Sequence, residues 1–169
     1  GKGVIYVFAS GNSYTLGDDT NFKGYTNSRY TISVGAVGKD GIHSSYSTPG
    51  ASLFIAAPGC DHEDSFNHVT AATGAGCRNS GVGTSFACPV VSGTVALMLE
   101  ANPELTWRDV QGILAKTSRP VADARDTSGR RNAAGLWHSN LYGFGIIDAA
   151  AAVLETQSWA LYGPEKMLV

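Results

Sequence analysis

A serine at the start of a long apolar segment is the residue of this sequence best suited to chemistry. Residues 81–89 read GVGTSFACP and lead into VVSGTVALML, which has no polar face and predicts a fully buried helix. Pro89 fits in the first turn, where its missing N–H would have had no intrahelical partner. Ser85 would then stand at a helix N-terminus, where free N–H groups and the helix dipole stabilise developing negative charge. An exposed hydroxyl beside such an N–H is what an acyl-transfer nucleophile requires.

A second candidate lies far upstream, where a glycine turn ends an apolar run. Residues 4–9 read VIYVFA and predict a buried parallel strand, which ends at Ser10, Gly11 and Asn12. Sites in open α/β sheets form at the carboxyl edge of the strands, and Asn12 would offer its amide there. Such a turn by itself is usually only a turn. Together with Ser85, it predicts a second hydrogen-bond donor for an oxyanion.

Composition limits the class of protein. The 169 residues are enough for one domain with its own core, and a low charged content with 21 glycines suits a compact, turn-rich chain with buried sheet. A net charge of −2 gives no reason to expect a nucleic-acid partner. The acidic run 61–64 with His68 lacks metal-ligand spacing and is interpreted as a solvated turn.

Short strands and capped helices complete an α/β pattern. Apolar runs predict strands at 30–34, 51–57 and 69–73, and residues 74–83 form a glycine-rich approach to Ser85. Thr106, with Asp109 three residues later, predicts a capped helix, and Asp148 caps an alanine-rich helix over 149–154. The expected fold is a mostly parallel sheet with a buried central helix that begins at Ser85.

These motifs resemble those of the subtilase family of serine peptidases. The Gly–Thr–Ser sequence, followed by a small residue and by Pro89, has the form of the subtilase nucleophile motif, and the runs GYTNSRYTISV (24–34) and LTWRDVQ (105–111) are similar to the kexin/furin branch. The resemblance implies a partial three-layer subtilisin-like fold over 1–159, the C-terminal half of a catalytic domain. It implies that 160–169 begin a following β-rich, P-like domain or a linker.

The same resemblance assigns roles to individual residues. It implies a serine endopeptidase that cleaves peptide or protein substrates through an acyl-enzyme at Ser85, with Asn12 in the oxyanion hole. The substrate-binding residues that it implies are Ala9, Ser10, Gly11, Lys23 and Thr84. Residue 23 is acidic in the convertases, at the floor of the arginine pocket. A cation there would repel arginine, so dibasic specificity is not expected.

A calcium ion is a further expectation from the resemblance. Asp18 falls where convertases have a calcium-binding aspartate, although Asp18–Asp19 also suits a solvated loop. The acidic residue that the branch has in the turn after residue 44 is Thr48 here. Thr20 and Gly50 replace a convertase cysteine pair.

The cysteines leave two pairings open. Cys88 is expected to be a core thiol on the central helix. Cys60 and Cys77 could bridge each other; alternatively, the resemblance implies that Cys77 pairs with a cysteine in the missing N-terminal half. Either bridge implies an oxidising compartment, and hence the secretory pathway or the extracellular space.

A general base and an orienting acid are not evident in the sequence. Subtilases carry them before the serine in Asp…His…Ser order, and this chain contains neither an Asp-x-Gly nor a His-Gly-Thr motif. His138 follows Ser85 and is therefore disfavoured as the base. We expect a fragment that is inactive without the N-terminal half. The alternatives are a pseudoprotease scaffold of the same fold and, less well supported, another serine hydrolase, since the Gly-x-Ser-x-Gly elbow is absent.

Overall fold

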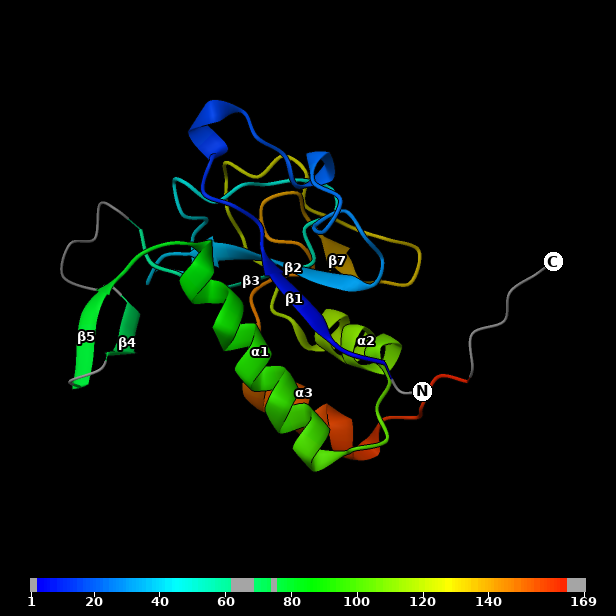
Figure 1. Ribbon diagram of the computed structural model, residues 1–169. Helices are drawn as coiled ribbons and strands as arrows, with labels where there is room; N and C mark the ends of the chain where they lie inside the picture. Colours follow the sequence, from blue (N-terminus) through cyan, green and yellow to red (C-terminus); the bar gives the residue numbers. More distant parts are fainter. Residues whose placement is uncertain (1–2, 62–68, 74–75, 164–169) are drawn as a thin grey trace.

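A three-stranded parallel sheet forms the centre of the chain (Figure 1). The computed structural model describes residues 3–61, 69–73 and 76–163. The sheet has the order β1-β2-β3, and Val34 of β2 pairs with Ala9 on one side and with Ile55 on the other. Its strands are β1 (Tyr6–Ala9), β2 (Thr31–Val37) and β3 (Ile55–Pro58). Three of the predicted strands are thus confirmed, and the α/β class with them.

Three helices begin where the sequence predicts them. They are α1 (Thr84–Ala101), α2 (Trp107–Thr117) and α3 (Ala149–Ser158). Thr106 and Asp109 form a reciprocal capping box at the start of α2, and the Asp148 side chain accepts a hydrogen bond from the Ala151 N–H at the start of α3.

The sheet separates two apolar clusters of unequal size. Alternate residues of β2, namely Ile32, Val34 and Ala36, share one cluster with buried side chains of all three helices. Val37 and Ala56 lie in the other cluster with Tyr142. This second cluster is completed by loop residues and by Trp137 of the short strand β7 (Trp137–His138). Among the described residues, therefore, helices cover one side of the sheet and loops take the place of a third helical layer.

Helix α1 is buried on one face only, which corrects the expectation of a fully buried helix. Ala87, Val91, Val95 and Met98 pack in the core, whereas Leu97 is 52% exposed. By length and composition alone α1 could cross a membrane, but here it is the core helix against the sheet.

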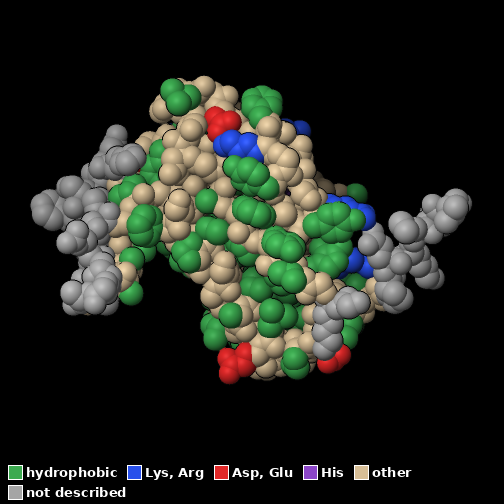
Figure 2. Space-filling model, in the orientation of Figure 1, with side chains coloured by type: hydrophobic (Ala, Val, Ile, Leu, Met, Phe, Trp, Pro, Cys, Tyr) green, Lys and Arg blue, Asp and Glu red, His purple; other side chains and the backbone are tan. Residues whose placement is uncertain are grey.

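The β1 strand beside α1 is an edge of the sheet, and Tyr6 is also 52% exposed. Figure 2 shows hydrophobic side chains gathered over β1 and α1. No element among the described residues covers this apolar outer face of α1.

Smaller elements surround this centre. The hairpin of β4 (Val69–Thr73) and β5 (Gly76–Gly81) projects beside the start of α1 in Figure 1, so most of the expected glycine-rich approach is a strand. Two-residue strands β6 (Arg130–Arg131) and β7 (Trp137–His138) pair antiparallel. Two 3-10 turns, η1 (Tyr14–Leu16) and η2 (Thr20–Phe22), lie in the loop after β1.

The segment after α3 remains attached to α2. The Trp159 indole and the Tyr162 N–H both donate to Asp109 Oδ1, at 3.0 and 2.7 Å, and the Arg108 side chain donates to the Gly163 carbonyl. Residues 160–163, which the sequence places in a following domain or linker, therefore pack on the helical side of the described chain.

Candidate active site

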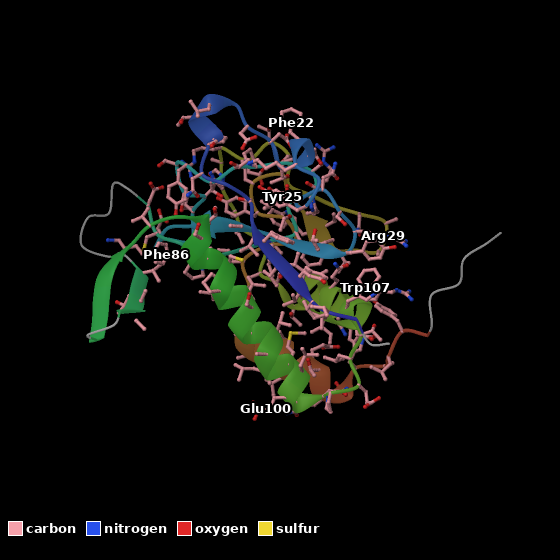
Figure 3. The ribbon with its side chains drawn as sticks, viewed as in Figure 1. Phe22, Tyr25, Arg29, Phe86, Glu100 and Trp107 are labelled. Carbon is pink, nitrogen blue, oxygen red and sulfur yellow. The ribbon has the colours of Figure 1, made fainter. Side chains whose placement is uncertain are left out.

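The parallel sheet and α1 bring the two predicted catalytic residues to the same end of the fold. The carboxyl end of β1 and the N-terminal end of α1 lie side by side, and β1 and α1 are in contact (Figure 1). Gly83 is the N-cap of α1, and Ser85 is the second residue of the helix and is exposed. Figure 3 shows Phe86 at this end of α1 and Tyr25 close to β1. Ser85 and Asn12 thus meet as predicted, although 72 residues separate Asn12 from Thr84.

Thr84 holds the Asn12 amide in one orientation. Asn12 Oδ1 accepts hydrogen bonds from the Thr84 N–H at 3.0 Å and from the Thr84 hydroxyl at 2.8 Å. The Thr84 hydroxyl in turn accepts a bond from the Gly11 N–H at 3.3 Å. Because the carbonyl oxygen of the amide is engaged twice, its Nδ2 must point the other way. None of the described residues accepts a hydrogen bond from Asn12 Nδ2, which leaves both of its hydrogens for a ligand.

Asn12 Nδ2 and the Ser85 N–H flank one small space above Gly83. A Cβ atom built on Gly83 would stand 3.2 Å from Asn12 Nδ2 and 3.8 Å from the Ser85 nitrogen. Gly83 has a φ of +139°, which side chains of L-residues rarely tolerate, so the space stays open. The Ser85 N–H is one of the first helical donors and has no acceptor among the described residues. Two hydrogen-bond donors beside an exposed serine hydroxyl have the geometry of an oxyanion hole.

The residues predicted to bind substrate divide into buried and accessible ones. Thr84 is 1% exposed and its hydroxyl is committed to Asn12, so its observed contacts support the oxyanion donor. Ser10 is fully buried, its N–H donates to Val34, and its hydroxyl has no partner among the described residues. Ala9 and Gly11 are half-buried at the end of β1.

Lys23 lies next to this strand end, as the resemblance implies, but it is already paired. Its ammonium forms an ion pair with Asp18 Oδ2 and a 3.5 Å hydrogen bond to the Ser10 carbonyl. The hydrogen bond from Lys23 holds the pKa of the Asp18 carboxyl below its usual value. The resemblance places Lys23 in the substrate pocket and Asp18 at a calcium site. Nothing in the spacing of the two residues indicates that they form an ion pair.

The residues around Asp18 do not fit a calcium site. Calcium takes six to eight oxygen ligands, several of them carboxylates. Here the ammonium of Lys23 occupies Asp18 Oδ2, and the neighbouring Thr48 offers only a hydroxyl, 3.4 Å away. No group of three or more His, Cys, Asp or Glu side chains gathers within the described part of the chain.

The positions of the replaced cysteine pair are neighbours. The Thr20 N–H donates to the Pro49 carbonyl at 2.8 Å, and a Cβ on Gly50 would fall 2.1 Å from Thr20 Oγ1. Gly50 therefore has no room for a side chain while Thr20 occupies the facing position. Hydrogen bonds join these two loops in this chain.

Neither described histidine reaches Ser85. His138 Nε2 is hydrogen-bonded to the Leu53 carbonyl at 3.0 Å, and its ring packs on Phe144. His43 is buried and hydrogen-bonded to the Ser47 carbonyl, and burial lowers its pKa, which favours the neutral imidazole. The expectation that His138 is not the base agrees with these contacts. His62, His68 and the rest of the acidic run after Asp61 lie outside the described residues.

The described cysteines have structural environments. Cys88 is half-buried against the core, and burial raises the pKa of its thiol, so it suits the expected core role. Cys60 is buried, with a positive φ of 60°. The side chain of Cys77 lies outside the described residues, and the two pairings of Cys60 and Cys77 both stay predictions.

Comparison with known proteins identifies the family. Residues 1–145 match the subtilase family, and the chain belongs to that family. Over 158 residues it is 42% identical to kexin of Saccharomyces cerevisiae, covering 94% of this chain and 19% of kexin. It is 43% identical over 171 residues to proprotein convertase subtilisin/kexin type 6 of Rattus norvegicus, covering 100% of this chain and 18% of that protein. The chain thus spans about a fifth of the length of these relatives.

Solved structures support the fold. A serine protease of Aeromonas sobria, solved in complex with its chaperone, superposes with a TM-score of 0.84 at 23% identity, covering 96% of this chain and 38% of that one. A protease from Pseudoalteromonas arctica gives a TM-score of 0.69 at 28% identity, covering 91% of this chain and 43% of that one. The predicted subtilisin-like architecture is therefore confirmed for the part of it that this chain contains.

Proposed function

We propose that this chain is part of a serine endopeptidase that hydrolyses peptide bonds through an acyl-enzyme on Ser85. The observation that carries the proposal is the convergence of Asn12 Nδ2 and the Ser85 N–H on the space above Gly83. Family membership and the convertase relatives support the same activity.

The geometry suggests how each residue contributes. The Ser85 hydroxyl would attack the carbonyl carbon of the peptide bond, and the carbonyl oxygen would become negatively charged. Asn12 Nδ2 and the Ser85 N–H would donate hydrogen bonds to that oxygen. Because Thr84 fixes the amide in advance, little reorganisation is required when the charge develops. The base and the orienting acid would come from the segment that precedes this chain in a complete subtilase domain.

The uncovered face of α1 and β1 supports that N-terminal segment as a partner. No strand of the described residues pairs with the outer edge of β1, and Leu97, Val90 and Tyr6 offer apolar surface beside it. A further parallel strand with its own helix would cover both. We place the domain at residues 1–159, with a P-like β-rich domain or a linker from residue 160. On its own the chain would be inactive, since neither of the histidines in the described part of the chain reaches Ser85.

Family membership supports a proposal for the substrate and for the compartment. The substrate would be a peptide or a protein, and nothing in the net charge of −2 favours nucleic acid. The relatives support work in the secretory pathway or outside the cell, and a bridge at Cys60 or Cys77 would be consistent with an oxidising compartment.

Active-site labelling tests this proposal. The full-length protein that contains this chain should react covalently with a fluorophosphonate probe, and Ser85→Ala should abolish the labelling. Ser92→Ala, which removes an exposed hydroxyl further along α1, is the matched control and should label normally. Folded wild-type protein that does not react would contradict the endopeptidase and favour the pseudoprotease.

A further inference from the structure

The ammonium of Lys23 lies beneath the turn that carries the oxyanion donor. It contacts Asp18 Oδ2 and the Ser10 carbonyl, and a Cβ on Gly11 would stand only 2.8 Å from Lys23 Nζ. The Lys23 and Asp18 side chains are 26% and 21% exposed, so both charges are partly shielded from water. A positive charge therefore contacts the Ser10 carbonyl and lies beside Gly11, the two residues just before Asn12.

Thr48 links this ion pair to the turn on both sides of Asn12. The Thr48 N–H donates to the Gly11 carbonyl at 2.9 Å, and Thr48 Oγ1 accepts a bond from the Ser13 N–H at 3.1 Å. The same hydroxyl donates to Asp18 Oδ2 at 3.4 Å. The ion pair, Thr48 and the backbone of residues 10–13 thus form one connected polar cluster.

We infer that Lys23 is an internal cation that positions the oxyanion turn and takes the place of a bound calcium ion at Asp18. Lys23, Asp18 and Thr48 together fix Ser10 to Ser13 from below, while Thr84 fixes Asn12 from the side of α1. Lys23 acts here through Asn12 as a positioning residue, and this role rests on the proposed function of Asn12.

The charge of lysine and its covalent attachment to the chain explain why it can replace a bound cation at Asp18. A carboxylate that is partly removed from water is stabilised by a cation or by strong donors nearby. Lys23 supplies one positive charge through its own chain, so the charge cannot dissociate on dilution or be removed by a chelator. Lysine holds fewer oxygen atoms than calcium does, because an ammonium has three donors, whereas calcium can bind six or more oxygens. The cluster meets this limit by using Thr48, a hydroxyl that both donates and accepts.

Thermal unfolding in the presence and absence of calcium tests the inference without reference to activity. Asp18→Asn in the full-length protein should lower the unfolding midpoint by about 2–4 °C. The decrease should be the same in excess EDTA and in millimolar calcium, because Asp18 binds Lys23. Asp40→Asn, the same change on an exposed loop, is the control for charge. A decrease that appears only in calcium would show that Asp18 is a calcium ligand and would overturn the inference.

A double-mutant cycle tests the pairing itself. Lys23→Met and Asp18→Asn should each destabilise, and the double variant should lose less than the sum of the two, since neither charge is then left without its partner. Strictly additive losses would overturn the pairing.

Labelling kinetics test the positioning role. Lys23→Met should slow fluorophosphonate labelling of Ser85 about tenfold, whereas Lys39→Met on an exposed loop should not. A small phosphonate lacks a side chain for the specificity pocket, so its rate reports the oxyanion turn. Unchanged labelling by Lys23→Met would refute the positioning role while leaving the proposed function intact. Wild-type protein that does not label at all would refute the function, while the thermal experiments would still test the ion pair.

Discussion

The Thr84 hydroxyl donates a 2.8 Å hydrogen bond to Asn12 Oδ1 and so joins the first residue of α1 to the turn that ends β1. A free asparagine amide can rotate and present either its oxygen or its nitrogen to a substrate. Here two bonds from Thr84 engage the oxygen, and the nitrogen faces the space beside Ser85. Thr84 thereby determines which end of the amide meets the developing oxyanion.

Replacing Thr84 by valine should impair catalysis while leaving substrate binding nearly intact. Valine keeps the shape and the backbone N–H but removes the hydroxyl that orients Asn12. Complete loss of an oxyanion donor in a subtilisin costs about 10²–10³ in kcat, and partial loss of its orientation should cost about tenfold. Steady-state kinetics of the full-length protein would measure this, with KM within about twofold of wild type. Thr84→Ser keeps the hydroxyl and should retain most of kcat; a serine variant as impaired as the valine one would argue against the role of the hydroxyl.

Adding a methyl group at Gly83 should close the oxyanion space. The new Cβ would lie 3.2 Å from Asn12 Nδ2, and alanine would be strained at a φ of +139°. Gly83→Ala should therefore lose at least about 10²-fold in kcat. Gly76→Ala is a control for backbone strain, because Gly76 has a φ of +144° and no atom of the described residues lies within 4 Å of the position of its Cβ. Comparable loss of activity in both variants would show that strain, and not obstruction of the oxyanion space, is responsible.

Specificity at the arginine-binding position of the convertases should depend on the charge of residue 23. In the wild type the Lys23–Asp18 pair is neutral overall and has no free carboxylate to hold a substrate cation. Lys23→Asp would place two carboxylates near the end of β1, and a substrate arginine could neutralise them. We expect kcat/KM for arginine-containing peptides, relative to leucine-containing ones, to rise about tenfold or more. Lys39→Asp serves as the control, and an unchanged ratio in Lys23→Asp would place residue 23 outside the pocket.

The sequence was sufficient where one local pattern determined one structure. The Gly–Thr–Ser run placed Ser85 correctly at a helix start, because glycine before an apolar helical segment leaves few alternatives. The end of β1 placed Asn12 correctly because parallel strands carry polar residues out at their carboxyl edge. The cap at Thr106 was equally local and is confirmed.

Features that depend on distant contacts could not be predicted in this way. The Lys23–Asp18 pair forms only because two turns fold the loop back under β1, and charge alone does not show which of several acids a lysine will meet. The apolar outer face of α1 was interpreted as buried, because composition reports that a face is apolar but not whether this chain covers it. Thr84 looked like a substrate contact next to Ser85, and only the geometry shows it turned toward Asn12.

The turn that packs against β3 should be sensitive to a single methyl group. A Cβ on Gly143 would fall 2.2 Å from the backbone carbon of Phe54, whereas a Cβ on Gly135 would meet no described atom within 4 Å. Both glycines have positive φ, +59° and +78°, so alanine carries a similar local strain at each. Gly143→Ala should lower the free energy of unfolding by about 3 kcal/mol or more, and Gly135→Ala by about 1 kcal/mol. Denaturant unfolding of the two variants measures the difference, and equal losses would contradict the close approach of Gly143 to β3.

Stability in acid should depend on Asp123. Its side chain is 5% exposed and accepts hydrogen bonds from the Arg125 guanidinium at 3.1 Å and from the Tyr142 hydroxyl at 2.6 Å. The bonds from Arg125 contribute most to lowering the pKa of Asp123 to about 2, from a usual value near 3.8. A carboxyl whose pKa is lower in the folded state stabilises the fold above its unfolded pKa and loses that contribution as the pH falls.

The window for this loss runs from about pH 4 down to pH 2. Across it Asp123 should contribute about 1–2 kcal/mol to the free energy of unfolding, less than the full shift implies, because Arg125 is exposed and solvent screens the pair. Urea unfolding of the wild type and of Asp123→Asn at pH 5, 4, 3 and 2 would measure it. The variant should be less stable at pH 5, and the two free energies should approach each other as the pH falls. Asp40→Asn, on an exposed loop, should show no such convergence, and a constant gap between wild type and Asp123→Asn down to pH 2 would show that Asp123 is not the titrating group.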